Sequence, residues 1–348
     1  MTLPDLMYFD DGTPVESPAD WPVRRREIWD AVVPLEYGGL PPAPVRTRTE
    51  VLHTATVRRM NSVRYVSCRV NVETGAVQPF SFMLYLHIPP GDGPFPAILT
   101  GDACWRYVSD EVVAEVLRRG FVLAQFNRVE LAPDVPGTDR SSGIYPLYPD
   151  AQFGALAAWA WGYHRCVDAL LEHEAVDGAH IAVVGHSRGG KTSLLAGATD
   201  ERIALTSAND SGAGGAGCYR MQGPNSETLG DLIRRFPYWF GPELGEYVGR
   251  ETELPFDQHF LKALVAPRLL LTTEAFDDLW ANPSGTWQTH AAVREVYRRL
   301  GVEERAGIWF RPGGHEHGLA DWQALLDFAD WHWRGVAPAR PFDLNPFA

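Results

Sequence analysis

The stretch IAVVGHSRGGKTS, residues 181–193, constrains the fold more than any other part of the chain. An apolar run typical of a buried strand leads into a glycine-rich turn, and the residues after the turn are typical of a helix. Gly185, Ser187 and Gly189 fit the pattern G-x-S-x-G, in which glycines on either side of a serine let a strand turn sharply into a helix. This stretch therefore predicts a turn that exposes the hydroxyl of Ser187.

The same letters also fit a second motif. Gly185 and residues 190–192, Gly-Lys-Thr, match G-x-x-x-x-G-K-[ST], the loop that cradles nucleotide phosphates. Both motifs join a strand to a helix, so the local context does not separate them. The remainder of the chain has to decide between a nucleophilic serine and a phosphate loop.

The composition excludes several classes of protein. A net charge of −13 argues against a nucleic-acid or anionic membrane surface, because such surfaces need clustered Lys and Arg. No apolar run approaches the roughly 18 residues of a membrane span. The start, MTLPDLMYFDDG, lacks the basic and apolar segments of a secretory signal, so we expect a cytoplasmic protein, or a secreted or periplasmic one if a signal was removed. Four widely spaced cysteines without a C-x-x-C pair predict neither a zinc ribbon nor a disulfide framework.

Apolar periodicity predicts the order of the elements. Strands are expected in two runs within 49–72 and at 80–88, 95–100, 121–126, 181–185, 203–208, 268–273 and 308–310. Helices are expected at 21–33, after Ser109 up to Gly120, at 151–172, after the Ser187 turn through Ala198, and at 286–300 and 320–333. We expect residues 1–46 to wrap the surface of the domain that residues 47–348 form.

Strands that alternate with helices predict a mostly parallel central sheet with helices on both faces, a three-layer α/β sandwich. A phosphate loop more often opens its domain, and it needs an acid at the end of a later strand to hold Mg²⁺. Asp210 and Glu274 follow later strands, so this requirement is not excluded. The α/β-hydrolase fold demands more, namely an acid and then a histidine downstream of the serine, and the chain supplies both. We therefore predict an α/β-hydrolase catalytic domain.

The candidate general base is His315, in the Gly-rich segment GGHEHG between the last predicted strand and the last predicted helix. A loop at that position can bring the imidazole to the serine hydroxyl. His317 is the alternative. A metal site is the weaker interpretation, because two alternating histidines lack a third ligand in the sequence, and we expect neither a metal nor a cofactor.

Two carboxylates can orient the histidine. Asp210 ends the strand after the elbow helix, and Asp278 follows the next predicted strand. One carboxylate is enough to fix the tautomer of the base and to stabilise the imidazolium, so only geometry can choose.

Two cations follow the serine. The backbone N–H of Arg188 lies where this fold builds its oxyanion hole, and its guanidinium can add a charged donor. Lys191 lies one helical turn further on, which places its ammonium near the mouth of the pocket. The alternative, a solvated helix start, leaves unexplained why positive charge lies at a helix N-terminus. A cationic pocket in an acidic protein suits an ester of an acidic or hydroxyl-rich substrate.

With these residues assembled, most of the chain resembles the glucuronoyl esterase family of carbohydrate esterases, particularly its bacterial members. The segments that carry the resemblance are DGTPV, DWPVRRREIW, FNRVELAPD, FGALAAWAWGYHR, GHSRGGKTSLLAGATDERIAL, NDSGAGG, FPYWF, DDLWANP and GGHEHG. The resemblance implies an α/β-hydrolase that cleaves esters joining glucuronate carboxyls, as on xylan, to alcohols such as those of lignin. Its partner would be a small-molecule or oligosaccharide uronate ester.

The resemblance also implies roles for residues. Ser187 is the expected nucleophile, His315 the base and Arg188 an oxyanion stabiliser. The residues at positions that contact the uronate sugar in the family are Lys191, Glu227 and Trp280. Acids occur in the family at both candidate positions, and many relatives carry Glu where this chain has Asp210, which favours Asp278 slightly.

Three other interpretations remain open at this point. The first is an acetyl or other acyl-carbohydrate esterase of the same fold. The second is a nucleotide-binding module that uses Lys191 and Thr192, and the third is an inactive carbohydrate-binding relative.

Overall fold

The computed structural model describes residues 2–58, 63–76, 78–104, 108–137 and 139–347, and these residues form one nine-stranded sheet. The strands are β1 (Arg46–Val57), β2 (Val63–Glu73), β3 (Phe80–Ile88), β4 (Phe95–Thr100), β5 (Val122–Phe126), β6 (Val176–His186), β7 (Leu205–Asn209), β8 (Leu269–Ala275) and β9 (Ala306–Arg311). Their spatial order is β1-β2-β3-β5-β4-β6-β7-β8-β9. Strands β4 to β9 run parallel, while β1, β2 and β3 pair antiparallel with their neighbours.

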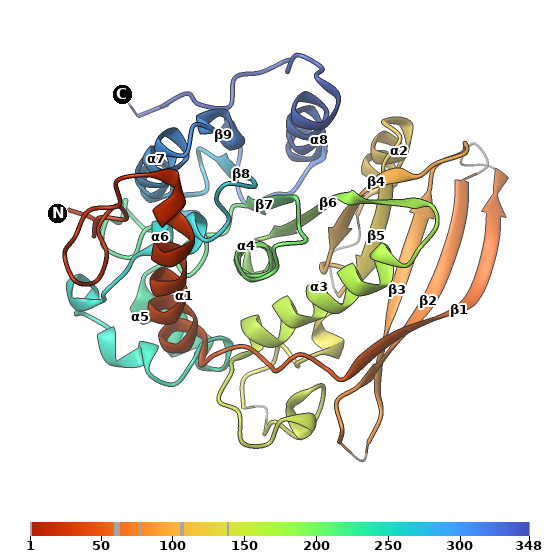
Figure 1. Ribbon diagram of the computed structural model, residues 1–348, viewed down its shortest axis with the longest axis horizontal. Helices are drawn as coiled ribbons and strands as arrows, with labels where there is room; N and C mark the ends of the chain where they lie inside the picture. Colours follow the sequence, from red (N-terminus) through yellow and green to blue (C-terminus); the bar gives the residue numbers. More distant parts are fainter. Residues whose placement is uncertain (1, 59–62, 77, 105–107, 138, 348) are drawn as a thin grey trace.

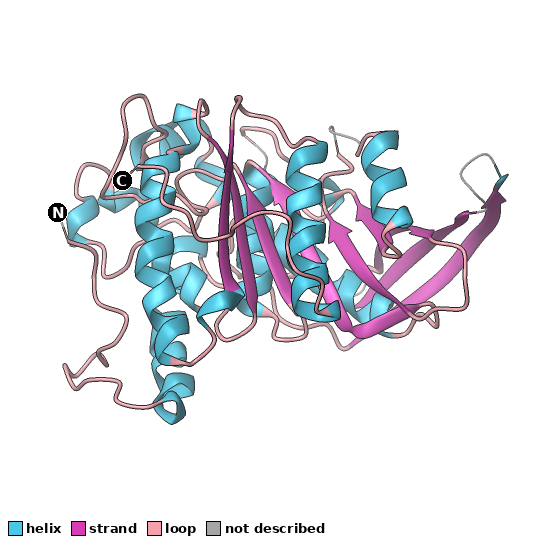
Figure 2. Ribbon diagram, turned by 90° about the horizontal axis from the view of Figure 1, so that it is seen from above, coloured by secondary structure: helices cyan, strands magenta, loops and turns pink. Residues whose placement is uncertain are grey.

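Helices cover both faces of this sheet, which confirms the predicted α/β-hydrolase architecture (Figure 1). They are α1 (Trp21–Tyr37), α2 (Asp110–Arg118), α3 (Ala155–Leu171), α4 (Arg188–Thr199), α5 (Leu229–Arg235), α6 (Gln258–Ala263), α7 (Pro283–Arg299) and α8 (Leu319–Arg334). Helices α2 and α8 pack on one face around one hydrophobic cluster, and α1, α3, α4, α6 and α7 contribute to a larger cluster on the other. Figure 2 shows the strands twisting progressively from one edge of the sheet to the other.

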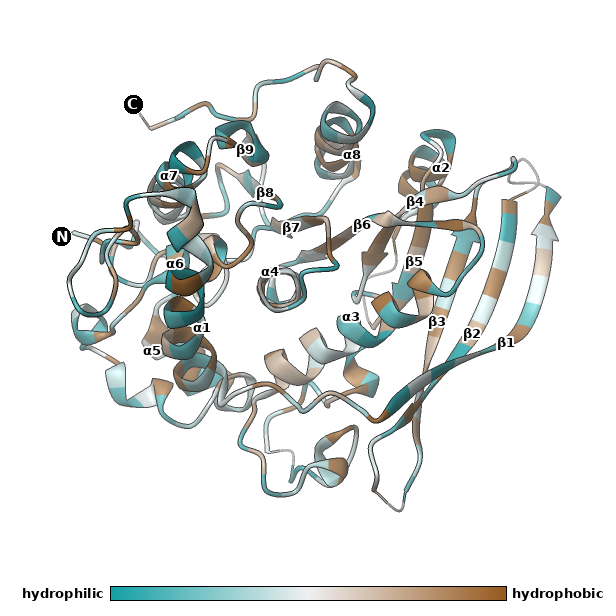
Figure 3. Ribbon diagram, in the orientation of Figure 1, coloured by the Kyte–Doolittle hydropathy of each residue, from teal (hydrophilic) through white to brown (hydrophobic). Residues whose placement is uncertain are grey.

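The burial of residues along a strand depends on what packs against its two faces. In β3 every second residue is buried, and the hydropathy is correspondingly banded along β2 and β3 (Figure 3). All five residues of β5 are buried because helices lie on both sides of it. The central position of β6, between β4 and β7, puts the turn after it at the middle of the carboxyl edge of the parallel strands.

The N-terminal segment lies against the body of the domain. Helix α1 packs on α6, and Trp21, Ile28 and Val32 are buried in the larger cluster. The indole N–H of Trp21 donates to the carbonyl of Ala266 at 3.3 Å. No helix among the described residues is both long and apolar enough to cross a membrane.

Candidate active site

The turn between β6 and α4 has the geometry of a nucleophile elbow. Ser187 adopts φ 57° and ψ −123°, a strained conformation for a residue with a side chain. A Cβ on Gly185 would collide with the backbone of Gly189, and one on Gly189 would collide with the carboxylate of Asp102, so the tight turn requires glycine at both positions. Ser187 is half-buried, and its side chain makes no capping hydrogen bond to the start of α4.

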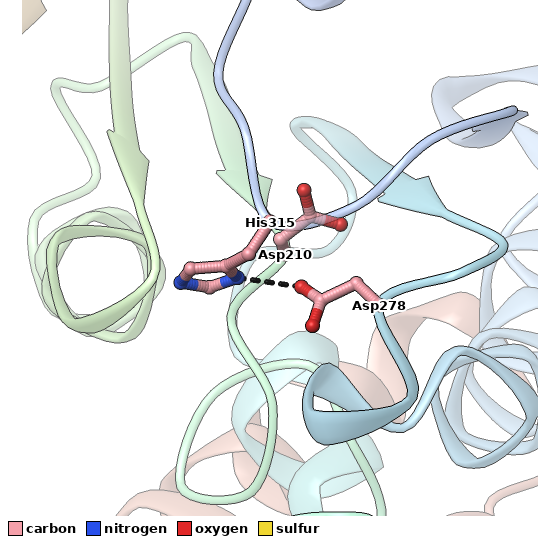
Figure 4. A group of neighbouring side chains, drawn as sticks. All are labelled: Asp210, Asp278 and His315. Atoms are coloured by element: carbon pink, nitrogen blue, oxygen red, sulfur yellow. Dashed lines mark hydrogen bonds and ion pairs between the residues drawn. The ribbon is translucent and has the colours of Figure 1, made fainter.

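His315 and Asp278 form a hydrogen-bonded pair at the same edge of the sheet. Nδ1 of His315 lies 2.5 Å from Oδ2 of Asp278 (Figure 4). The Asp278 side chain is 5% exposed and that of His315 is 41% exposed, so a buried acid holds an accessible imidazole. A carboxylate accepts a hydrogen bond from Nδ1–H, and this leaves Nε2, which points away from both carboxyl groups in Figure 4, able to take a proton.

Asp210 lies beside this pair but binds other partners. Its Oδ1 accepts from the backbone N–H of Ala275 at 2.7 Å, and its Oδ2 accepts from Nη2 of Arg311 at 3.1 Å. Burial and the neighbouring Asp278 raise the pKa of Asp210 above its ordinary value, although the hydrogen bond from Ala275 and the positive charge of Arg311 oppose the rise. Atoms of Asp210, Asp278 and His315 that could coordinate a metal ion lie within 4.8 Å of one another. However, Nδ1 of His315 and Oδ2 of Asp278 already share a hydrogen bond. The arrangement is that of an acid–base pair with a second acid behind it.

A stack of rings packs His315 against the elbow. The His186 ring lies 4.5 Å from that of His315 and 5.7 Å from that of His317, which in turn lies 5.1 Å from Trp322. Nδ1 of His186 lies 2.6 Å from Oδ1 of Asn209, whose Nδ2 donates to neighbours, so Nδ1 of His186 carries the hydrogen. His317, the alternative candidate for the base, therefore packs against His186 and Trp322, whereas His315 packs against His186 and hydrogen-bonds to Asp278.

Asp134 and two aromatic rings hold the guanidinium of Arg188. Nη1 of Arg188 lies 2.9 Å from Oδ2 of Asp134, and the guanidinium lies over the rings of Trp239 and Phe236, 4.8 and 5.2 Å from their centroids. The other oxygen of Asp134 accepts from Tyr238 Oη and Trp239 Nε1, both at 2.9 Å. The cation beside Ser187 is therefore fixed in place, rather than solvated at a helix start.

Lys191 is buried, in contrast to the expectation that its ammonium lies near the mouth of the pocket. Its side chain is 3% exposed, and Nζ donates to Glu227 Oε2 at 2.7 Å and to the carbonyls of Ser211 and Ala213 at 2.7 and 2.6 Å. The sequence did not reveal this because Glu227 lies 36 residues further along the chain. An ammonium engaged in this way does not fit a phosphate loop.

Trp280 lies at the surface beside this ion pair. The residue is 36% exposed, and the Arg235 guanidinium lies 4.9 Å from the centroid of its ring. The carbonyl of Trp280 accepts a hydrogen bond from the backbone N–H of Glu227 at 2.9 Å. The three residues expected to contact a sugar, Lys191, Glu227 and Trp280, are thus linked to one another through Glu227.

The sequence alone did not identify several residues of the candidate site. Asp134 positions Arg188, Arg311 contacts Asp210, and Asp102 accepts from the His186 backbone N–H at 2.8 Å. Asp102 and Arg311 lie just after or at the carboxyl ends of parallel strands, where this class of sheet builds its sites. That position is the signal that could have identified them.

Comparison with known proteins agrees with this geometry. A family model described as glucuronyl esterase of fungi matches residues 70–301. The 4-O-methyl-glucuronoyl methylesterase of Podospora anserina is 33% identical over 326 residues, covering 90% of this chain and 63% of that protein. A carbohydrate esterase from an unknown prokaryotic organism is 30% identical over 403 residues, covering 97% of this chain and 90% of its own length.

Solved structures are similar over the whole domain. A carbohydrate esterase family 15 glucuronoyl esterase from Caldicellulosiruptor kristjansonii has a TM-score of 0.88 at 32% identity and covers 100% of this chain and 94% of its own. A glucuronoyl esterase variant from Sporotrichum thermophile, in complex with methyl 4-O-methyl-β-D-glucopyranuronate, has a TM-score of 0.81 at 29% identity and covers 99% of this chain and 91% of its own. The resemblance found in the sequence is confirmed: the chain belongs to the glucuronoyl esterase family, carbohydrate esterase family 15.

Proposed function

We propose that this protein is a serine esterase that hydrolyses esters of glucuronic or 4-O-methyl-glucuronic acid through an acyl-enzyme on Ser187. The observation that carries the proposal is the 2.5 Å hydrogen bond between His315 and Asp278, formed at the sheet edge that also presents Ser187. The substrate class comes from the relatives, one of which holds a methyl 4-O-methyl-glucuronate ester.

The reaction follows from the roles of three side chains. His315 Nε2 takes the proton of Ser187 as the hydroxyl oxygen attacks the ester carbonyl, while Asp278 stabilises the imidazolium. When the tetrahedral intermediate collapses, the bond to the alcohol breaks and His315 gives its proton to the leaving oxygen. Water then attacks the acyl-enzyme with the same assistance and releases the uronic acid and Ser187.

Arg188 stabilises the developing oxyanion in this proposal. Its backbone N–H follows the nucleophile, and its guanidinium is held beside the turn by Asp134. A fixed cation contributes more than a mobile one because little reorganisation is needed as charge develops. Glu227 and Trp280 contribute a carboxylate and an exposed ring for sugar hydroxyls and a sugar face, and Lys191 supports them.

The test is turnover of methyl and benzyl esters of glucuronic acid by the wild type and by Ser187→Ala. By analogy with serine hydrolases in which loss of the nucleophile costs about 10⁶ in kcat, the variant should lose nearly all activity. Near-normal turnover by Ser187→Ala would contradict the proposal. Acetylated xylo-oligosaccharides and p-nitrophenyl acetate are the comparison substrates, and a uronate esterase should have a higher kcat/KM on the glucuronate esters than on either.

A further inference from the structure

Arg311 ends β9 and directly precedes the loop that carries His315. A guanidinium has five N–H donors, and the structure gives a partner to each. Nε donates to the carboxylate of Asp321 at 2.8 and 2.9 Å, and Nη1 donates to the carbonyls of Pro312 and Gly314, both at 3.2 Å. Nη2 donates to Oδ2 of Asp210 at 3.1 Å and to the carbonyl of Glu316.

Two of these acceptors flank the base in sequence. The carbonyls of Gly314 and Glu316 belong to the residues on either side of His315, so one buried guanidinium holds the backbone before and after it. The loop has little stiffness of its own, because Gly313 and Gly314 are adjacent glycines and Gly313 adopts φ +101°. A loop of this kind needs an external tie to keep an imidazole in one place.

Arg311 is itself fixed from two sides. The side chains of Asp210 and Asp321 are both 0% exposed, and they bracket a guanidinium that is 8% exposed. Asp321 also accepts from the backbone N–H of Gly318, at the other end of the loop, at 3.0 Å. The hydrogen bonds of Arg311 and Asp321 together therefore hold the loop from Pro312 to Gly318 at both ends.

We propose that Arg311 is the positioning residue of His315, and that Asp210 influences the base through Arg311 rather than by a direct hydrogen bond. The inference rests on the proposed function, since it assigns His315 as the base. It accounts for two buried acids beside one imidazole: Asp278 contacts the ring, and Asp210 contacts the guanidinium that holds the loop of the ring.

The first experiment compares Arg311→Ala and Arg311→Lys with wild type on a glucuronate methyl ester. A base displaced by about 1 Å can cost on the order of 100-fold in rate, so we expect kcat of Arg311→Ala to fall by about that factor. KM should stay within about threefold, because ground-state binding does not use the base. Lysine has three donors in no fixed plane and cannot reach the same five acceptors, so Arg311→Lys should fold and still lose roughly tenfold in kcat.

A matched control is Arg268→Ala. Arg268 also binds backbone carbonyls, those of Asp200, Ile203 and Leu264, but it lies next to the start of β8, at the opposite edge of the sheet from the site. Its loss should lower the thermal midpoint and leave kcat of the folded enzyme near wild type. Millimolar guanidinium chloride should restore part of the kcat of Arg311→Ala, and sodium chloride of equal ionic strength should not.

A double-mutant cycle tests the role of Asp210. If Asp210 acts through Arg311, Asp210→Asn should lower kcat in the wild-type background and change it little in the Arg311→Ala background. If the loss of kcat in the double variant equals the product of the losses in the two single variants, this assignment is overturned, because Asp210 would then affect the base independently of Arg311. If Arg311→Ala fails to fold, the same cycle is measured with Arg311→Lys.

Failure of the inference is distinguishable from failure of the proposed function. An active wild type with an equally active, folded Arg311→Lys would overturn the positioning role alone. A wild type that neither hydrolyses glucuronate esters nor reacts with a fluorophosphonate at Ser187 would overturn the esterase proposal, and the inference with it.

Discussion

Lys191 and Glu227 form a buried ion pair, with Nζ 2.7 Å from Oε2 and the two side chains 3% and 7% exposed. The three hydrogens of the ammonium are used by Glu227 and by the carbonyls of Ser211 and Ala213. The structure gives the other oxygen of Glu227 no partner among the described residues. We infer that Glu227 presents the free acceptor to a sugar hydroxyl, while the ion pair with Lys191 holds its carboxylate in place.

Replacement of Lys191 by Met should therefore be costly for stability. It leaves Glu227 as an unpaired charge in a buried site, a change that typically costs about 3–5 kcal/mol. Urea unfolding at pH 7 measures the free energy of unfolding, and the double variant Lys191→Met/Glu227→Leu should regain a large part of the loss, since it removes both charges. A Lys191→Met variant as stable as wild type would show that the pair does not have the buried geometry described.

Glu227→Gln separates binding from folding. Gln keeps an oxygen for Lys191 but turns the outward acceptor into an N–H donor, so a sugar hydroxyl that donates to Glu227 loses its partner. We expect KM for a glucuronate ester to rise by roughly tenfold, from loss of a hydrogen bond to a charged group worth about 1.5 kcal/mol, with a smaller change in kcat. Steady-state kinetics decide this, and an unchanged KM would remove Glu227 from the binding site.

The variants Asp278→Asn and Asp210→Asn should differ sharply in kcat. Asn at 278 no longer fixes Nδ1–H of His315, and in a serine protease the equivalent change lowers kcat by about 10⁴. Among the described residues, Asp210 hydrogen-bonds to the Ala275 backbone and to Arg311 rather than to the His315 ring, so its change should cost far less in kcat. Measurement of kcat for both variants, with the rate of fluorophosphonate labelling of Ser187 as an independent readout, distinguishes them. An Asp210→Asn defect equal to or larger than that of Asp278→Asn would reverse the assignment.

The sequence predicted local elements well where local chemistry determines them. The bounds of β3 and β4 match the expected 80–88 and 95–100, because apolar alternation and a Pro- and Gly-rich turn define both ends. Ser109 caps α2 as expected, accepting from the Val112 N–H at 3.3 Å. Helices α5 and α6 were not predicted, because they are only 7 and 6 residues long and depend on packing against distant segments.

The sequence suggested members of the candidate site but not the contacts between them. Order along the chain identifies a serine, an acid and a histidine, yet the contact of His315 with Asp278 depends on how two loops fold beside each other. The same holds for Arg188, whose partner Asp134 lies 54 residues earlier. A pattern in one sequence reports the type of a side chain, whereas partners brought together by the fold determine its burial and its hydrogen bonds.

Glu36 gives a prediction for the pH dependence of stability. It is fully buried in α1, where it accepts from Tyr219 at 2.9 Å and from Gln258 at 3.0 and 3.1 Å. Burial raises the pKa of Glu36 from 4.5 to about 7 in spite of these bonds. A carboxyl group with a raised pKa contributes stability that is complete below its unfolded pKa and is lost as the pH rises through its folded pKa.

The free energy of unfolding should therefore fall between pH 4.5 and 7 by an amount on the order of 3 kcal/mol from this group. Glu36→Gln has no such titration, so the difference between wild type and variant should change over that interval and level off above it. Urea unfolding of both proteins at a series of pH values measures it. A difference that stays constant with pH would contradict the prediction.

The last prediction concerns the ion pair between Arg188 and Asp134. Asp134 binds Arg188 through Oδ2 and binds Tyr238 and Trp239 through Oδ1. Asp134→Asn can keep the second set of bonds, but its amide N–H₂ then faces the guanidinium, so the cation loses its acceptor and shifts. Loss of one oxyanion donor costs about 10²–10³ in kcat, and a displaced donor should cost a large part of that, with little change in KM.

The matched control is Tyr238→Phe, which removes one bond to Asp134 and leaves Arg188 paired, so it should stay within about threefold of wild-type kcat. Equal effects of Asp134→Asn and Tyr238→Phe would mean that the ion pair does not position Arg188 for the reaction.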